Sequence, residues 1–266
     1  MNKVVLITGA SSGIGKVSAE YLFEKGFKVY GTSRNPGGDQ TGYTMLPLDV
    51  CDTASIRKAV ETILEKEGRI DVLVNNAGMG ITGPIEDTPT EQMKRVFDTN
   101  FFGPIEVMKA VLPSMREKRK GLIINITSIA GYMGLPFRGI YSATKGALEL
   151  LTESASMELK GFGIHVTNIA PGDFATSIAA GRYHAPVLEN SAYREVYQKS
   201  LDLMDEHVDQ GGDPMVMARK IHLVIMRPSP GIHYKVGDFM QKFSIVLKRL
   251  LPSKIYERML MNHYKL

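Results

Sequence analysis

The sequence predicts an α/β fold in which about seven strands form one parallel sheet with helices on both faces. Short β-branched or apolar runs alternate with longer helical segments over most of the 266 residues. This alternation is typical of βαβ units, whose right-handed connections make neighbouring strands parallel. Several of the short runs are apolar throughout, as strands covered on both faces are. A glycine-rich turn, Thr8 to Gly15, joins the first predicted strand to the first predicted helix.

The elements follow from these runs in chain order. The predicted strands are Lys3–Thr8, Lys28–Thr32, Thr44–Leu48, Val72–Asn75, Leu122–Thr127, His165–Ile169 and Ile232–Val236. The predicted helices have apolar residues at helical spacing and are Ile14–Lys25, Thr53–Lys66, Glu91–Lys118, Tyr141–Lys160 and Asp213–Met226. No linker rich in Pro, Gly or Ser divides the chain, so residues 1–238 are expected to form one domain.

Two regions break the alternation. Residues 172–212 are too many for an idle connection and are expected to carry helices and to act as a lid. Residues 239–266 are expected to form an amphipathic helical extension, with a second helix starting at Pro252. The apolar stripe of its first helix consists of Phe239, Phe243, Val246, Leu247, Leu250 and Leu251. Three roles remain open for this extension: docking on the protein's own core, covering a cleft, and peripheral contact with an anionic membrane surface.

Charge and composition exclude several classes of function. The net charge is +4, but the stretch from His233 to Leu266 holds seven Lys or Arg and two acids, which leaves the rest of the chain at −1. A nucleic-acid-binding surface is therefore not expected. The single cysteine, Cys51, cannot form an internal disulfide. No residues have metal-ligand spacing, and no apolar stretch is long enough to span a bilayer, so we expect no metal and a cytoplasmic location.

The glycine-rich turn can hold a phosphate group. Gly9, Gly13 and Gly15 allow a tight turn and a close approach of the backbone to a ligand. The helix that follows offers unpaired N–H groups and a partial positive charge to an anion. The expected contacts are Gly9, Ser11, Ser12, Gly13, Ile14 and Gly15. This spacing differs from the common G-x-G-x-x-G fingerprint, so the turn alone does not decide the ligand.

A tyrosine and a lysine four residues apart can form a general acid. Tyr141 and Lys145 share one face of the predicted helix, since residues at i and i+4 are neighbours. A nearby ammonium favours the tyrosinate and lowers the pKa of the tyrosine toward the working pH. Such an acid can deliver the proton that turns a carbonyl oxygen into a hydroxyl, while a nicotinamide supplies the hydride.

The order of the motifs resembles the short-chain dehydrogenase/reductase family over roughly Lys3 to Val236. The resemblance rests on the glycine-rich turn, Asn75-Asn76-Ala77-Gly78, Asn100, Ser128, Tyr141-x-x-x-Lys145 and Pro171-Gly172. It implies a single Rossmann-type, doubly wound sheet with ligands at the carboxyl ends of the strands, and hence a dinucleotide-binding catalytic domain over residues 1–238. It also implies that family members pair through the helix of Tyr141 and the next helix, so a homodimer is expected, with a tetramer as the alternative.

The resemblance assigns further residues. Ser128 would polarise the substrate carbonyl, Asn100 would steer a water beside Lys145, and Lys145 would also reach the nicotinamide ribose. Thr127 and Ser128 are expected to point in opposite directions, and the family motif selects Ser128. The remaining expected cofactor contacts are Asp49, Val50, Asn76, Ala77, Gly78, Pro171, Gly172 and Thr176.

The end of the second predicted strand favours NADP(H) over NAD(H). An acid at this place would bind the ribose 2′-hydroxyl and repel a 2′-phosphate. The stretch Val29 to Asn35 holds no acid, whereas Arg34 can form paired hydrogen bonds with a phosphate and Ser33 can donate one more.

The residues around the expected pocket favour a hydrophobic, lipid- or steroid-like carbonyl or alcohol. The expected substrate contacts are Met79, Met133, Phe137, Phe174 and His184. Met fills irregular shapes, and the stretch Gly134 to Tyr141 is similar to family members that act on steroids, retinol and lipid ketones. Two alternatives stay open: a reductase of polar or thioester-bound 3-oxo groups, and a nucleotide-binding protein without turnover.

Overall fold

The structure is a computed structural model that describes residues 2–37, 42–174, 181–209, 211–264 and 266. Within these residues, seven parallel strands form one sheet in the order β3-β2-β1-β4-β6-β7-β9. They are β1 (Val4–Ile7), β2 (Lys28–Ser33), β3 (Thr44–Pro47), β4 (Val72–Asn75), β6 (Gly121–Ile126), β7 (Ile164–Pro171) and β9 (His233–Val236). The predicted doubly wound α/β fold is confirmed, and each predicted strand corresponds to one of these seven.

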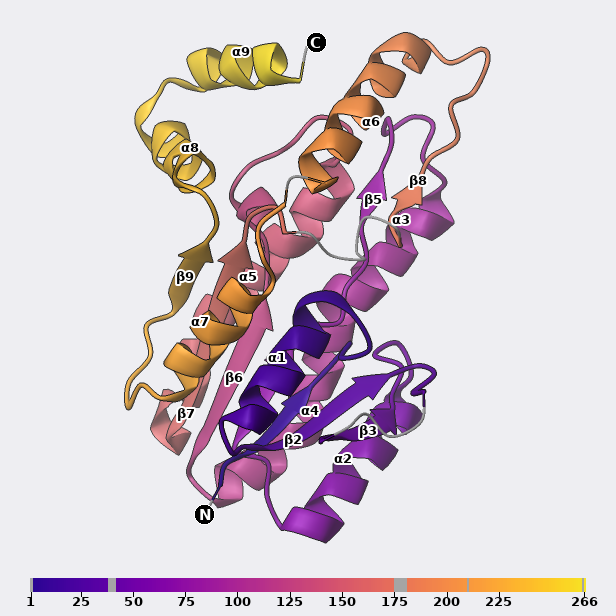
Figure 1. Ribbon diagram of the computed structural model, residues 1–266. Helices are drawn as coiled ribbons and strands as arrows, with labels where there is room; N and C mark the ends of the chain where they lie inside the picture. The colour runs from indigo at the N-terminus through magenta and orange to yellow at the C-terminus, as the bar shows by residue number, and fades with distance from the viewer. Residues whose placement is uncertain (1, 38–41, 175–180, 210, 265) are drawn as a thin grey trace.

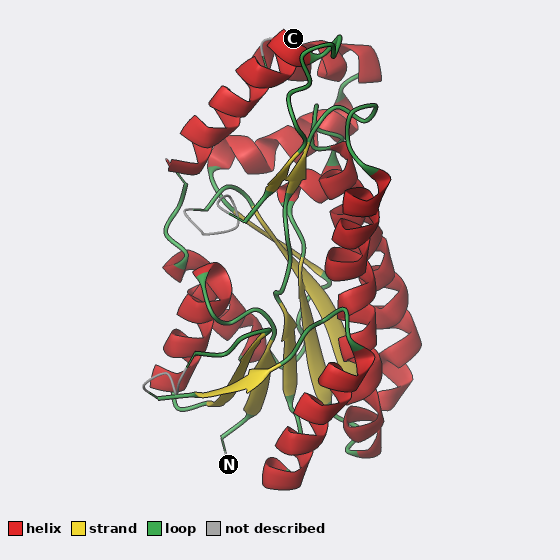
Figure 2. Cartoon of the chain, turned by 90° about the vertical axis from the view of Figure 1, so that its right-hand side faces the viewer, coloured by secondary structure: helices red, strands yellow, loops and turns green. Residues whose placement is uncertain are grey.

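Helices cover both faces of this sheet (Figure 2). Helices α1 (Gly13–Glu24) and α7 (Met215–Ile225) pack together on one face. Helices α2 (Thr53–Glu67), α4 (Gly103–Glu117) and α5 (Gly139–Leu159) cover the other. Strands β1, β4 and β6 are buried along their whole length, which accounts for their continuous apolar runs, whereas the edge strands β3 and β9 are partly exposed.

The chain changes direction between β1 and β4, which are neighbours in the sheet although β2 and β3 separate them in sequence. The loops that leave the carboxyl ends of these strands therefore diverge and leave a crevice, where ligands bind in folds of this kind. The glycine-rich turn after β1 and the residues after β4 and β6 all lie at this edge. The predicted motifs thus meet in space although more than a hundred residues separate them.

One predicted helix is wrong in detail. The segment Glu91–Lys118 is not continuous: α3 (Thr90–Phe97) is followed by a π-helical turn, Asp98–Phe102, and then by α4. Pro104 lacks an N–H and cannot complete the α-helical hydrogen bond to the carbonyl of residue 100, so the helix widens at this point. A two-stranded parallel pair that the sequence did not predict joins β5 (Ile81–Thr82) to β8 (Tyr183–His184).

The region after β7 contains α6 (Arg194–Asp209), in agreement with the helix expected inside residues 172–212. After β9, the chain forms α8 (Phe239–Leu250) and α9 (Ser253–His263), which lie beyond the carboxyl end of β9 (Figure 1). Among the described helices, none combines the length and the apolar character that crossing a bilayer requires.

Candidate active site

The glycine-rich turn is tight enough that two of its glycines have no room for a side chain. Gly9 has a φ of +67°, and a Cβ built there would lie 2.9 Å from Cα of Ala77. A Cβ on Gly15 would lie 2.2 Å from the carbonyl oxygen of Gly9. Helix α1 begins at Gly13, directly after this turn, so its free N–H groups face the crevice.

A groove of about 670 Å³ runs along the turn and the ends of β2, β3 and β4. It brings together most of the predicted cofactor residues: Gly9, Ser11, Ser12, Gly13, Ile14, Ser33, Arg34, Asp49, Val50, Asn76, Ala77 and Gly78. Gly15 is buried behind the turn and does not line it. Other residues of the lining were not predicted from the sequence, and they include Asn35, Leu48, Cys51, Arg95, Asp98 and Thr99. Arg95 lies inside a helix far along the chain, so no local motif pointed to it.

The groove has the chemistry of a dinucleotide site. The hydroxyl of Ser33 is buried and has no hydrogen-bond partner among the described residues, so it is available to a ligand. Arg34 and Arg95 add two cations to the lining, and the start of α1 adds partial positive charge. The carboxylate of Asp49 accepts a hydrogen bond from the backbone N–H of Cys51 at 2.9 Å, which fixes this loop. These groups fit a pyrophosphate and a further phosphate.

The groove ends beside the tyrosine and lysine. A Cβ on Gly78 would lie 3.2 Å from Oδ1 of Asn100 and 3.5 Å from Nζ of Lys145, so these two residues adjoin the last lining position. Tyr141 and Lys145 are both buried on α5, and Nζ of Lys145 lies 5.9 Å from the centre of the Tyr141 ring. Nζ of Lys145 donates a hydrogen bond to the carbonyl of Ile126 at 2.9 Å. The hydroxyl of Ser128 is hydrogen-bonded to that of Tyr141.

The sequence predicts that the ammonium of Lys145 lowers the pKa of Tyr141, but in the structure other groups determine this pKa. Burial raises the pKa of Tyr141 above its ordinary value, and the guanidinium of Arg138 is the strongest influence in the opposite direction. The hydrogen bond from Ser128 and the charge of Arg182 also lower the pKa of Tyr141. Burial lowers the pKa of Lys145 to about 8, and the carboxylate of Glu149 opposes this shift.

Asn100 occupies the π-helical turn and is completely buried. Its side-chain amide forms two hydrogen bonds with the backbone of Met79: Oδ1 accepts from N–H at 2.8 Å and Nδ2 donates to C=O at 2.9 Å. Nδ2 also lies 3.3 Å from the hydroxyl of Thr144 on α5. The turn therefore connects the loop after β4 to α5. Single π-turns inside α-helices occur often at functional sites.

A buried carboxylate that the sequence reasoning missed lies one turn beyond Lys145. Glu149 accepts hydrogen bonds from Thr127 at 2.5 Å and from Tyr132 at 2.8 Å, and it also bonds Asn168. It lies 3.1 Å from Nδ1 of His233. Thr127 and Ser128 follow the end of β6, and both contact α5: Thr127 bonds Glu149, whereas Ser128 bonds Tyr141 two turns earlier on the same helix. The sequence did contain a sign of this role, because Glu149 is a charged residue on the core-facing side of the predicted helix Tyr141–Lys160.

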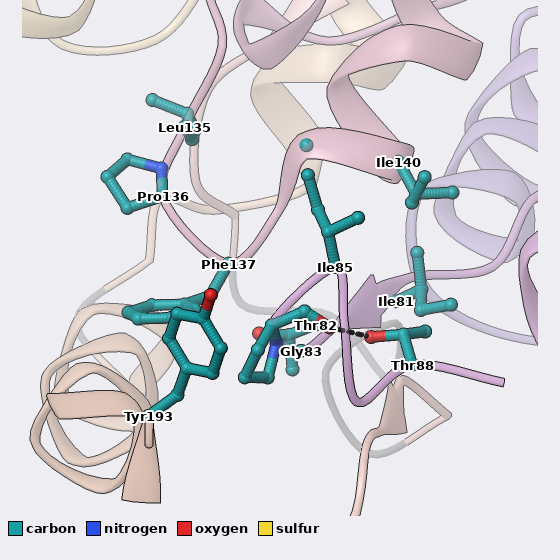
Figure 3. A pocket seen from close by; sticks show the side chains of 12 residues that line it. Ile81, Thr82, Gly83, Ile85, Thr88, Leu135, Pro136, Phe137, Ile140 and Tyr193 are labelled. Carbon is teal, nitrogen blue, oxygen red and sulfur yellow. Dashed lines mark hydrogen bonds between the residues drawn. The ribbon is translucent and has the colours of Figure 1, made fainter. Parts of the chain in front are cut away.

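An apolar hollow of about 290 Å³ is lined in part by residues that directly precede Tyr141, namely Leu135, Pro136, Phe137, Gly139 and Ile140 (Figure 3). Ile81, Ile85 and Ile140 form one side of it, and Phe137 and Tyr193 form another. Ile81 and Ile140 also pack in the same cluster as Tyr141. The polar side chain of Thr88 is bonded to the carbonyl of Pro84 at 2.6 Å, so it presents no free donor to the hollow.

The other predicted substrate and cofactor residues are dispersed. Phe137 lines the hollow, and Met79 lines the groove. Phe174 is buried in the main core, and His184 is exposed on β8. Pro171 ends β7 and Gly172 follows it, where a Cβ on Gly172 would collide with the side chain of Gln241 in α8. Thr176 lies outside the described residues.

The C-terminal extension contacts the site region. Met133 packs with Ile129, Ile245 and Tyr256, and its sulfur accepts a hydrogen bond from the Tyr256 hydroxyl at 3.0 Å. Met133 therefore lies under the extension. Tyr264, just after α9, is buried and hydrogen-bonded to Arg138, which precedes α5. Arg138 also lies 5.6 Å from the Tyr141 ring, so one cation connects the extension to the tyrosine.

The predicted apolar stripe of the extension is divided. Leu247 and Leu251 pack toward the domain, whereas Phe239, Phe243, Val246 and Leu250 are exposed. Within the described residues, no three His, Cys, Asp or Glu side chains are arranged to hold a metal ion.

Comparison with known proteins places the chain in a family. Residues 3–186 match the model of the short chain dehydrogenases. The chain is 41% identical to 3-ketodihydrosphingosine reductase of Bacteroides thetaiotaomicron over 256 residues, which is 96% of this chain and 95% of the relative. A short-chain dehydrogenase from Streptomyces avermitilis has a TM-score of 0.83 at 30% identity, covering 100% of this chain and 97% of that one. ElxO with NADP bound has a TM-score of 0.72 at 28% identity, covering 89% and 97%. The chain belongs to the short-chain dehydrogenase family and is an oxidoreductase that acts on alcohol and carbonyl groups.

Proposed function

We propose that this protein reduces or forms a carbonyl group with Tyr141 as the general acid or base. The observation that carries the proposal is the hydrogen bond between Ser128 and Tyr141, with Tyr141 next to Lys145, whose Nζ adjoins Gly78 in the groove lining. A carbonyl oxygen near both hydroxyls would accept a hydrogen bond from Ser128 and a proton from Tyr141. When bound, a nicotinamide supplies the hydride.

Lys145 and Asn100 support this step. Lys145 is buried, adjoins Gly78 and is oriented by the carbonyl of Ile126, so its ammonium can hold the ribose next to the reacting ring. Asn100 fixes the backbone of Met79 on the opposite side of the same space. We assign Tyr141, Lys145, Ser128 and Asn100 as the catalytic group, and the predicted groove residues as the cofactor contacts.

We propose NADP(H) as the preferred cofactor. The end of β2 offers the guanidinium of Arg34 and the hydroxyl of Ser33, which has no partner in the part of the chain that the structure describes, and the sequence there holds no carboxylate. A 2′-phosphate would neutralise the cation and satisfy the hydroxyl. ElxO, which resembles this chain in fold at 28% identity, has been solved with NADP bound.

A hydrophobic, lipid-like ketone or its alcohol is the substrate that fits best. The hollow beside the Tyr141 cluster has apolar walls, and the side chains that line it offer few free polar groups. A relative of nearly the same length is a 3-ketodihydrosphingosine reductase. Polar or thioester-bound 3-oxo substrates remain the alternative, and the extension over Met133 and Arg138 makes a bulky polar group harder to place.

Residues 1–238 form the catalytic unit in this proposal, and residues 239–266 cover its cleft. Association as a homodimer, a cytoplasmic location and peripheral membrane contact through 239–266 accompany the proposal as predictions.

A cofactor-consumption screen tests the proposed function. Long-chain 3-keto lipids, steroids, retinoids and small ketones would be compared with NADPH and NADH, with the Tyr141→Phe variant as the blank. We expect the highest kcat/KM with NADPH and a long-chain ketone. Turnover restricted to small polar or thioester-bound 3-oxo compounds would contradict the substrate assignment, and equal loss of signal in both proteins would contradict the role of Tyr141.

A further inference from the structure

The outward face of α8 is apolar and exposed. Phe239, Phe243, Val246 and Leu250, here called the α8 stripe, are 72%, 38%, 44% and 75% exposed. Their spacing of four, three and four residues places them on one side of the helix. The rings of Phe239 and Phe243 stack with their centres 5.6 Å apart. Contiguous apolar surface of this kind on a soluble protein marks an interaction site more often than chance exposure.

The helix is held in place by its opposite side, so the α8 stripe is not the face that docks on the domain. Ile245 is 2% exposed and packs with Ile129 and Met133. Gln241 donates a hydrogen bond to Asp173 at 3.0 Å and, together with Asp238, forms a capping box at the start of the helix. These contacts fix the rotation of α8 about its axis and leave the stripe facing outward.

Cations accompany the stripe. Lys242 and Arg249 are exposed on α8 on the side next to the stripe, whereas Lys248 lies on the opposite side and lines the groove beside Gly134 and Leu135. The two acids between His233 and Leu266 are already engaged, because Asp238 caps α8 and Glu257 pairs with Lys254 at 2.9 Å. Helix α8 itself, Phe239–Leu250, carries three cations and no acid, so the helix that bears the stripe is positive.

This charge decides between two occupants of the stripe. In a two-fold dimer built on this face, the same patch would meet its own copy, so cations beside the stripe would face equal cations. An anionic lipid surface would instead pair with them, while the apolar side chains enter the boundary between headgroups and acyl chains. We propose that α8 docks the protein on an anionic lipid surface through the α8 stripe, with Lys242 and Arg249 near the headgroups.

Docking in this way would bring the site region close to the lipid. The chain continues from α8 into α9, whose inner side places Tyr256, Leu260 and Tyr264 against the domain. A groove of about 520 Å³ lies between this part of the extension and Gly134–Pro136, with Leu251, Tyr256 and Leu260 in its lining. Leu135 and Pro136 line both this groove and the apolar hollow near Tyr141. A substrate dissolved in the bilayer would thus meet the protein beside its apolar entrance, a consequence that rests on the proposed function.

Vesicle flotation of the full chain tests the docking without substrate or cofactor. The vesicles would contain phosphatidylcholine alone or mixed with phosphatidylglycerol, at low and at high salt. We expect binding to the anionic vesicles, little binding to the neutral ones, and weaker binding at high salt. Phe243→Ser with Leu250→Ser should weaken partitioning at least about ten-fold, since two large apolar side chains leave the interface. Lys242→Glu with Arg249→Glu should weaken it at low salt.

Matched variants separate this effect from general changes in surface. Leu223→Ser with Met226→Ser removes two similarly exposed apolar residues at the end of α7, and Arg57→Glu with Lys58→Glu reverses two exposed cations on α2. Both should bind vesicles as the wild type does. Every variant should keep its melting temperature and its turnover of a small soluble ketone.

Three outcomes would overturn the proposal. The wild type could fail to float with anionic vesicles, or the stripe variants could float as well as the wild type. Alternatively, light scattering could show that the stripe variants convert a dimer into a monomer, which would make a second copy the occupant. If the wild type binds vesicles but turns over no ketone, the result would instead count against the proposed function alone.

Discussion

Tyr141 is the residue on which the proposed chemistry depends most directly. Replacing it with Phe removes the hydroxyl that bonds Ser128 and leaves the ring in its buried position. We expect turnover to fall at least about 100-fold, as when a general acid is removed. Titration should show NADPH affinity close to that of the wild type, because the groove is unchanged. A variant that keeps most of its activity would mean that another group supplies the proton.

Lys145 links the site to pH-dependent stability. Burial lowers its pKa to about 8 from the model-compound value of 10.5. The unfolded chain therefore binds more protons than the folded protein between these two values, and the contribution of this residue to stability rises with pH across that window. Lys145→Met should stabilise the protein near neutral pH by up to about 3 kcal/mol. Urea unfolding should show the difference from the wild type shrinking between pH 8 and 10.5, and a constant difference would contradict the shift.

Arg34 is expected to select the cofactor. Arg34→Asp removes a cation from the proposed 2′-phosphate position and adds an acid that suits a ribose hydroxyl. A charge-assisted contact contributes roughly 1.5–3 kcal/mol, so NADPH affinity should fall about ten- to a hundred-fold. Arg34→Ala is the control, since it should weaken NADPH without improving NADH. If the wild type itself binds NADH more tightly by fluorescence titration, the cofactor assignment is wrong.

At the residue scale, the sequence predicted side chains that belong to local motifs and missed those that only the fold brings near. The turn at Gly9 was predictable because its backbone needs glycine whatever surrounds it. Arg95 and Glu149 were not predictable, because their roles depend on which face of each helix is turned inward: Arg95 faces the groove and Glu149 faces the core. Strand alternation did not describe Thr127 and Ser128 correctly, because β6 ends at Ile126 and both side chains contact α5.

Among the elements, the strands were predictable because strands covered on both faces are apolar throughout. The segment from Glu91 to Lys118 was harder, since its composition suits one helix and the widened turn at Asn100 serves a contact with Met79 that the sequence does not reveal. The pair β5–β8 has two residues in each strand, too few for a pattern to appear. The helices of the extension were predicted, but which of their faces docks was not.

Removing the extension should expose part of the domain as well as the cleft. A chain that ends at Asp238 loses Ile245 and Tyr256, both buried against Met133 and Ile129. Burial of one large apolar side chain contributes roughly 1.5–3 kcal/mol, so we expect a loss of a few kcal/mol in the free energy of unfolding. Chemical denaturation would measure it. NADPH binding should persist, because the groove lies on β1 to β4, while KM for long-chain ketones should rise. Unchanged stability and unchanged KM would show that the extension neither docks nor covers the cleft.

The whole molecule is expected to be a dimer formed through α5. Leu150 and Met157 are 67% and 70% exposed and lie two turns apart on the outer side of this helix, whose inner side carries Tyr141 and Lys145. Pairing along this face would bury both residues and hold the catalytic helix rigid from outside.

Leu150→Glu with Met157→Glu should therefore give a monomer in light scattering at micromolar concentration. Leu223→Glu with Met226→Glu, on the exposed side and end of α7, should leave the dimer intact. A wild type that is already monomeric, or an α5 variant that stays dimeric, would exclude this interface. Because the α8 stripe includes no residue of α5, loss of this dimer should not by itself abolish binding to anionic vesicles.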